Sequence, residues 1–254
     1  MRSQLSHLFK VYNRIKVQQN CALCLLSSDQ DIALCSDCEA DLPWQLYTCP
    51  CCALAQDNSQ LCDECKFDPP SFSQVIAPWR FDFPINSLIN RFKHHHDWVL
   101  GRLLGGLLAR DLQQKFSEGT PVADALLAMP LSLERQRERG FNQAQMLAQW
   151  LAKPLQLPIL NNAAQRLPRQ AQQQLSAAQR KENLQGVFQL NRSINWQGLH
   201  IAIVDDVVTT GATCRELAKV LLQAGVQQVD VYCLARTPKS DYQPKSSSAS
   251  GRRA

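Results

Sequence analysis

Long apolar stretches are missing from this chain of 254 residues. No run of about eighteen uncharged apolar residues occurs, so the sequence predicts no membrane-spanning helix. The motif G-x-x-x-x-G-K-S/T is absent and no G-x-G-x-x-G follows a strand, which argues against a nucleoside-triphosphate site. Residues 1–17 mix polar and apolar side chains, a pattern that favours an amphipathic helix over a signal peptide and predicts a cytoplasmic protein.

Apolar residues are nevertheless frequent, at 45% of the chain, which is enough for a globular core. A chain of this length has room for one α/β domain and a smaller module. The formal net charge is only +5, from 27 Lys and Arg against 22 Asp and Glu. Net charge therefore gives little support for nucleic-acid binding, which has to rest on local basic patches.

The most informative segment is H-I-A-I-V-D-D-V-V-T-T-G-A-T, residues 200–213. Residues 201–204 are apolar and mostly β-branched, which is typical of a buried parallel strand. Two carboxylates, Asp205 and Asp206, end the strand, and a loop of threonine and glycine leads to helical spacing over residues 214–222.

A strand that ends in acids and leads through a Thr/Gly loop into a helix suits a phosphorylated sugar. The helix N-terminus offers free amides and a positive dipole to a phosphate. Threonine hydroxyls and the close backbone approach of glycine complete an anion site, while the carboxylates can accept hydrogen bonds from sugar hydroxyls. The alternative is an ordinary buried strand followed by a turn.

This segment closely resembles the phosphoribosyl-pyrophosphate (PRPP) motif of the type I phosphoribosyltransferases. The resemblance implies a parallel-sheet α/β fold, two acids that hold the ribose 2′ and 3′ hydroxyls, a loop that binds the 5′-phosphate, and Mg²⁺ bound with PRPP. The residues carried over by this resemblance are Asp205, Asp206, Thr209, Thr210, Gly211, Ala212 and Thr213.

Cysteine is concentrated at one end of the chain, where nine of the 11 cysteines lie between Cys21 and Cys65. Two thiolates two residues apart can bind one metal ion from a tight turn, and a second such turn completes a tetrahedron. The pattern therefore favours two structural zinc ions over disulfides or a redox C-x-x-C. The four C-x-x-C pairs supply Cys21, Cys24, Cys35, Cys38, Cys49, Cys52, Cys62 and Cys65.

How these pairs combine is left open by the sequence. Ten residues separate the first two pairs and nine the last two, which favours two zinc ribbons in tandem. Interleaved ligation is the geometric alternative, and Cys51, beside Cys52, can replace a neighbouring ligand.

A second group of charged residues, Arg135, Arg137 and Arg139, follows a short apolar strand predicted at residues 124–129. Several positive donors at the carboxyl end of a strand can bind pyrophosphate. The alternative is a solvated surface segment, which is the common role of mixed Arg and Glu.

The four cysteine pairs, R-x-R-G-F-N-Q and V-D-D-V-V-T-T-G-A-T resemble, in this order, the ComF family over about residues 20–237. That family joins a double zinc ribbon to a phosphoribosyltransferase-type domain and is implicated in competence and the use of external DNA. The resemblance marks Lys93, Arg137 and Arg139 as candidate pyrophosphate ligands, although Lys93 can equally be solvated. It also includes a Q-x-x-L…R-x-x-N…F stretch formed by Gln172, Leu175, Arg180, Asn183 and Phe188.

These observations predict an α/β protein in three parts. An N-terminal helix and the double zinc ribbon occupy residues 1–68, the phosphoribosyltransferase-like domain residues 72–238, and a disordered tail residues 239–254. Strands are expected at 73–81, 124–129, 199–204 and 229–234, and helices at 85–116, interrupted near Gly105 and Gly106, at 142–151 and at 214–222.

Three functions remain open at this stage. The first is a phosphoribosyltransferase that uses PRPP with Mg²⁺, and the second a PRPP or nucleotide sensor without catalysis. The third is a competence factor that binds single-stranded DNA or DNA-uptake proteins. The motif favours PRPP binding, and nothing in the sequence names an acceptor or a catalytic residue.

Overall fold

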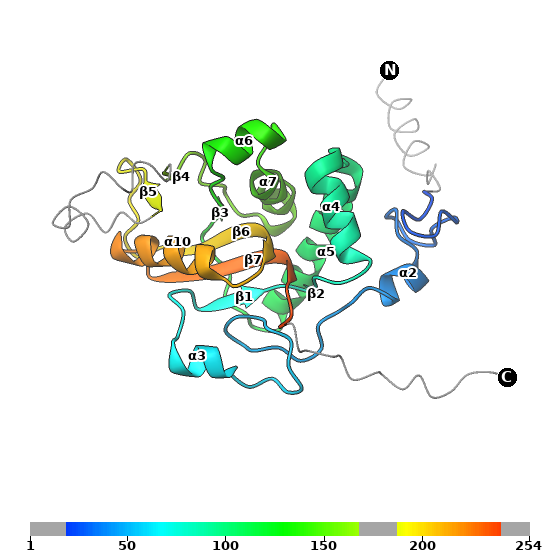
Figure 1. The fold of residues 1–254 in the computed structure, drawn as a ribbon, viewed down its shortest axis with the longest axis horizontal. Coiled ribbons are helices and arrows are strands. Elements are labelled where there is room, and N and C mark those ends of the chain that lie inside the picture. The colour runs from blue at the N-terminus through cyan, green and yellow to red at the C-terminus, as the bar shows by residue number, and fades with distance from the viewer. Residues whose placement is uncertain (1–18, 168–186, 240–254) are drawn as a thin grey trace, which may run out of the picture.

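The structure is a computed structural model that describes residues 19–167 and 187–239 (Figure 1). The helix predicted for residues 1–17 and the family positions from Gln172 to Asn183 lie outside these ranges. So does the predicted disordered tail, except for residue 239. Within the described ranges, no helix combines the length and the apolar character needed to cross a membrane.

A parallel sheet forms the centre of the fold. Its strand order is β1 (Gln74–Ile76), β7 (Gln228–Arg236), β6 (His200–Val208) and β3 (Ala125–Ala128), with the short β2 (Trp79–Arg80) also paired to β7. Every pairing in this sheet is parallel. The middle strands β6 and β7 consist mainly of buried apolar residues, as expected for a parallel sheet covered on both faces.

Helices α4 (Ile85–His95), α5 (Trp98–Ser117) and α7 (Gln143–Leu155) lie together on the upper side of the sheet in Figure 1. The helix α7 buries Ala144, Leu147, Ala148 and Leu151, the apolar face that the sequence predicts. Helix α10 (Ala212–Gln223) connects β6 to β7 and packs against β7. A separate antiparallel pair, β4 (Ala164–Arg166) and β5 (Phe188–Leu190), stands beside the main sheet.

The helical break predicted near Gly105 and Gly106 is wrong. Helix α5 runs through both glycines, and the chain breaks instead at His96, whose φ is 55°. The Asp97 carboxylate then caps α5 by accepting a hydrogen bond from the Leu100 amide at 3.2 Å. Gly105 allows α5 and α7 to pack closely, because a Cβ there would lie 3.3 Å from the Leu147 side chain.

Two further elements differ from the sequence prediction. Strand β6 continues to Val208 instead of ending at residue 204, because its ladder with β7 extends through the pair Val208 and Arg236. The arginine-rich segment, which is not among the helices predicted from the sequence, forms the helix α6 (Leu133–Arg139). The Ser132 side chain caps its start and Gly140, with a φ of 73°, ends it.

The cysteine-rich segment contains two short helices, α2 (Ser36–Ala40) and α3 (Asp63–Phe67), each of which begins directly after a cysteine, Cys35 or Cys62. In Figure 1, α3 lies on the side of the sheet opposite α4 and α5. Buried cysteines of this segment belong to the same continuous apolar core as the sheet. The cysteine-rich segment is therefore packed against the α/β part of the chain.

Candidate functional site

A cavity of about 350 Å³ lies at the carboxyl ends of β3 and β6. In open parallel sheets this is the edge where ligands bind. Six helices and strands contribute to it, together with the loops between them, so residues far apart in the sequence meet there. Its polar lining consists of Lys93, Arg135, Arg139, Asn142, Gln143, Arg166, Asp205, Asp206, Thr209 and Thr213.

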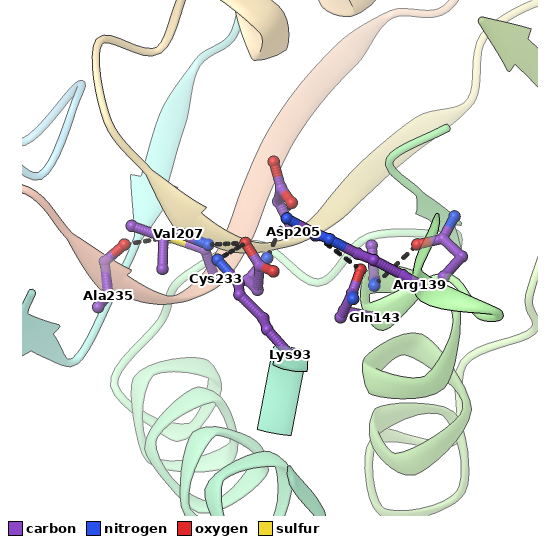
Figure 2. A network of polar contacts seen from close by, with 10 residues as sticks. Lys93, Arg139, Gln143, Asp205, Val207, Cys233 and Ala235 are labelled. Carbon is purple, nitrogen blue, oxygen red and sulfur yellow. Dashed lines mark hydrogen bonds and ion pairs between the residues drawn. The ribbon is translucent and has the colours of Figure 1, made fainter. Parts of the chain in front are cut away.

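The paired acids of the motif lie in the last part of β6, inside the cavity lining. Asp206 is 9% exposed, and its Oδ1 lies 2.9 Å from Nζ of Lys93, the ion pair drawn in Figure 2. Lys93 comes from the last turn of α4, so this contact joins a helix to the motif strand. The same Oδ1 accepts a hydrogen bond from the Val207 amide at 2.7 Å.

Asp205 has an unusual protonation equilibrium. Burial raises the pKa of its carboxyl to about 7, and the negative charge of Asp206 acts in the same direction. The positive charges of Lys93 and Arg166 oppose this shift. A cation or a hydrogen-bond donor brought by a ligand would therefore favour the ionised carboxylate.

The loop between β6 and α10 comprises residues 209–211. Gly211 caps α10 with a φ of 78°, the left-handed region that glycine adopts without strain. Thr209 and Thr213 line the cavity, Thr213 from the first turn of the helix. The Thr210 hydroxyl accepts a hydrogen bond from the amide of Ala212 at 3.3 Å, which organises the turn.

The three arginines of α6 point in two directions, toward the cavity and toward solvent. Arg135 and Arg139 both line the cavity, as residues four apart on a helix share a face. Arg137 is exposed and is not among the lining residues, because a residue two positions away points elsewhere on the helix. Figure 2 shows the Arg139 side chain directed toward Asp205, with its Nη1 3.2 Å from the Gln143 Oε1.

Sequence reasoning did not assign roles in the site to Asn142, Gln143 and Arg166. Asn142 caps α7, and its Nδ2 donates to the Met129 carbonyl at 3.0 Å, which fixes the helix start to the end of β3. Gln143 is 2% exposed, and its Nε2 has no hydrogen-bond partner among the described residues. A buried donor without a partner is costly, so this amide is available to a ligand in the cavity.

The eight cysteines of the four pairs form two groups. The first cysteine cluster is Cys21, Cys24, Cys35 and Cys38, and the second cysteine cluster is Cys49, Cys52, Cys62 and Cys65. Within each cluster the four sulfur atoms lie within 4.8 Å of one another. Consecutive pairs therefore combine, and the interleaved alternative is wrong.

The sulfur spacing fits a tetrahedral zinc ion. The Sγ atoms of Cys24 and Cys35 are 3.7 Å apart, and those of Cys52 and Cys62 are 3.6 Å apart. A tetrahedron with Zn–S bonds of about 2.3 Å has edges of about 3.8 Å. Cys51 is outside both clusters, and its carbonyl accepts a hydrogen bond from the Val75 amide of β1 at 2.7 Å.

Comparison with known families agrees with this architecture. The family model for the phosphoribosyl transferase domain matches residues 137–251, which include the end of α6, the acid pair and the β6–α10 loop. The parallel sheet, the family match and the cysteine clusters define a type I phosphoribosyltransferase fold preceded by cysteine clusters consistent with a zinc ribbon.

Comparison with individual relatives identifies the family within this class. The chain is 35% identical over 208 residues to "Competence protein F" of Haemophilus influenzae, covering 80% of this chain and 90% of the relative. It is 35% identical over 207 residues to "DNA utilization protein YhgH" of Escherichia coli K12, with the same coverage of 80% and 90%. "Competence protein ComFC" of Bacillus subtilis is 29% identical over 214 residues, covering 80% of this chain and 83% of the relative. The chain belongs to the ComF family.

Proposed function

We propose that this protein binds PRPP together with Mg²⁺ and acts, as a phosphoribosyltransferase-type protein, in the uptake or use of external DNA. One observation supports PRPP above all. A single cavity brings together an acid pair, a threonine loop at a helix N-terminus and several cationic side chains. Sugar hydroxyls, a 5′-phosphate and a pyrophosphate require these three kinds of group. The link to DNA rests on the names of the relatives, a competence protein and a DNA utilization protein.

Each group in the cavity has a chemical counterpart in PRPP. We assign the Thr209 and Thr213 side chains, and the backbone amides of the β6–α10 loop and the start of α10, to the 5′-phosphate. Asp205 and Asp206 accept hydrogen bonds from the ribose hydroxyls, and Arg139 and Lys93 neutralise the pyrophosphate. The free amide of Gln143 adds a donor close to Arg139.

Transfer of the phosphoribosyl group would break the C1–O bond to pyrophosphate while an acceptor bonds to C1. Bound Mg²⁺ would supply charge neutralisation on the departing pyrophosphate. The chain would contribute positioning and electrostatic stabilisation through Lys93 and Arg139. A second cavity, of about 680 Å³, shares Asn142 and Arg166 with the first and includes Gln136, Asn161 and Asn162, so it is the nearest place for an acceptor.

Binding of PRPP is the first expected result. Titration calorimetry with PRPP and Mg²⁺ should show one site per chain, because the chain contains one copy of the motif. Omitting Mg²⁺ should weaken binding, since the carboxylates and the pyrophosphate then repel each other. Absence of heat or of any other binding signal at millimolar PRPP would contradict the proposed function.

Single-stranded DNA is the second candidate ligand, and a specific surface favours it. Arg135 and Arg137 are exposed on α6. Beside this helix, the Trp98 and Phe141 rings lie 4.5 Å apart and Trp98 is 41% exposed. The His96 ring contacts both rings, and its Nε2 lies 3.2 Å from the Arg139 carbonyl. Aromatic rings next to positive charge are the usual elements of single-strand binding.

If DNA binds at this surface, replacing Arg135 and Arg137 by Gln should weaken binding and lower its salt dependence. For single strands, each lost phosphate contact should reduce the slope of log K against log salt by about 0.7. Fluorescence anisotropy with a labelled oligonucleotide at several salt concentrations measures this slope. The variant Arg192→Gln removes one charge from an exposed position on the β5–β6 connection and serves as the control. An unchanged affinity of the double variant at low salt would exclude α6 as the DNA site.

A further inference from the structure

The two cysteine clusters contact different parts of the α/β domain. Beside the first cysteine cluster, Glu39 of α2 forms an ion pair with Arg110 of α5. The second cysteine cluster lies instead against the β6–α10 loop. Cys52 and Cys65 share a crevice with Thr210, Gly211 and two arginines, Arg215 and Arg236. Only a small volume, about 10 Å³, remains open in this crevice, so the two surfaces are closely packed.

Arg236, the last residue of β7, connects these two surfaces. It is 5% exposed, and its Nε donates to the Cys52 carbonyl at 3.0 Å. Its Nη1 donates to the carbonyls of Val208 at 3.2 Å and Thr237 at 3.0 Å, and also to the Thr209 carbonyl. One buried guanidinium therefore holds a cysteine of the second cluster and the first peptides of the β6–α10 loop.

The direction of these hydrogen bonds determines where the loop amides point. In a planar trans peptide, the C=O of one residue and the N–H of the next point in opposite directions. Because the Val208 and Thr209 carbonyls face Arg236, the amides of Thr209 and Thr210 point away from it. These are amides at the start of the loop that we assign to the 5′-phosphate.

A second contact holds the helix that follows the loop. Arg215, in the first turn of α10, donates to the Asp68 carboxylate at 2.9 Å and to the Pro69 carbonyl at 3.2 Å. Asp68 directly follows α3, the helix that contains Cys65. The Asp68 side chain is 79% exposed, so this ion pair contributes little energy by itself. With Arg236 at the start of the loop and Arg215 just after it, the second cysteine cluster nevertheless contacts the chain on both sides of the β6–α10 loop.

We propose that Arg236 is a positioning residue through which the second cysteine cluster, and not the first, sets the conformation of the β6–α10 loop for a phosphate. The inference rests on the proposed PRPP site and on zinc in the second cluster. Zinc would fix the backbone of the knuckle that contains Cys52, and Arg236 would transmit that fixed position to Val208 and Thr209. Loss of zinc from the second cluster should then weaken phosphate binding at a site that contains no cysteine among its lining residues.

Two variants of Arg236 test the positioning role, with ribose 5-phosphate and inorganic pyrophosphate plus Mg²⁺ as probes. Arg236→Met removes the buried donor of the Cys52 and Thr209 carbonyls, while the Val208 carbonyl keeps its hydrogen bond from the Thr237 amide. Arg236→Lys keeps the charge but loses the planar arrangement of donors. We expect both variants to bind ribose 5-phosphate about tenfold more weakly or worse, as for the loss of a buried charged hydrogen bond. Pyrophosphate affinity should stay unchanged, because Lys93 and Arg139 do not contact Arg236.

The outcomes separate this inference from its alternatives. Wild-type affinity for ribose 5-phosphate is measured first, and its absence contradicts the proposed function. If the wild type binds and Arg236→Met binds equally well, the positioning role alone is wrong. Full affinity in Arg236→Lys would show that only the charge matters, and a parallel loss of pyrophosphate binding would indicate general damage. Either result overturns the inference.

Cysteine variants test the contribution of the second cluster. Cys62→Ala should weaken ribose 5-phosphate binding to about the same extent as Arg236→Met, about tenfold. Cys24→Ala, the matched change in the first cluster, should leave the affinity unchanged. Zinc content shows whether each variant has lost one ion, and the melting temperature shows whether the rest of the chain remains folded. Equal effects of the two cysteine variants, or no effect of either, would contradict a specific connection through the second cluster.

Discussion

Replacing Asp205 and Asp206 together by Asn is expected to abolish the stabilisation that PRPP with Mg²⁺ gives to the wild-type protein. A ligand present at one hundred times its dissociation constant raises the free energy of unfolding by about 2.7 kcal/mol. Both carboxylates line the cavity, and Asn offers neither their charge nor their full capacity to accept hydrogen bonds. Thermal unfolding with and without PRPP measures the increment in each protein.

The increment is the informative quantity, because the double variant also leaves Lys93 without its carboxylate partner and should be less stable on its own. Glu134→Gln with Glu138→Gln is the matched control. It removes two negative charges from exposed positions on α6 that are outside the cavity lining. The control should retain the wild-type increment. A full increment in the aspartate variant would show that PRPP does not bind through these acids.

Each chain is expected to contain two zinc ions, one in each cysteine cluster. Binding free energies of structural zinc reach about 10–16 kcal/mol in small zinc modules, so removal should unfold the segment that each ion holds. Cys62→Ala should reduce the content to one zinc ion, because three thiolates no longer close the coordination shell. Elemental analysis of protein purified without added zinc, together with circular dichroism, measures both effects.

Cys51→Ala is a stringent control, since Cys51 is adjacent to a ligand but outside both clusters. This variant should keep two zinc ions, and because Cys51 is half-buried its free energy of unfolding should fall by only about 1 kcal/mol. A loss of zinc in Cys51→Ala would mean that Cys51 is itself a ligand. A wild-type zinc content near zero would contradict the zinc assignment of both clusters.

The central motif was predictable because its chemistry and its local structure coincide in one short segment. A β-branched strand, two acids and a Thr/Gly loop leave few alternative interpretations. The length of β6 was not predictable, because acids are poor strand formers and residues 205–208 join the sheet only through pairing with β7. Tertiary pairing decided that boundary.

Helix α6 was missed for a different reason. Its sequence, L-E-R-Q-R-E-R, contains one apolar residue, so it has no hydrophobic periodicity to indicate a helix. Without that helix, Arg137 and Arg139 were selected as candidate pyrophosphate ligands, whereas the helical spacing directs Arg135 and Arg139 into the cavity. The role of Arg236 was not predictable either, because it is a single charged residue at the end of an apolar strand and its partners are carbonyls of distant residues.

The topology of the parallel sheet also determines that the cysteines are translated well before the sheet can form. All cysteines of the two clusters are translated before β1, yet the partner of β1 is β7, and Gln74 bonds to Asp230, 156 residues later. A nascent chain therefore presents its thiols to metal long before the sheet can close. Arg236 is translated after all of these cysteines, so a knuckle that had already bound metal would be in place to contact it. Metal supply during translation would thus determine whether a new chain acquires a competent phosphate loop.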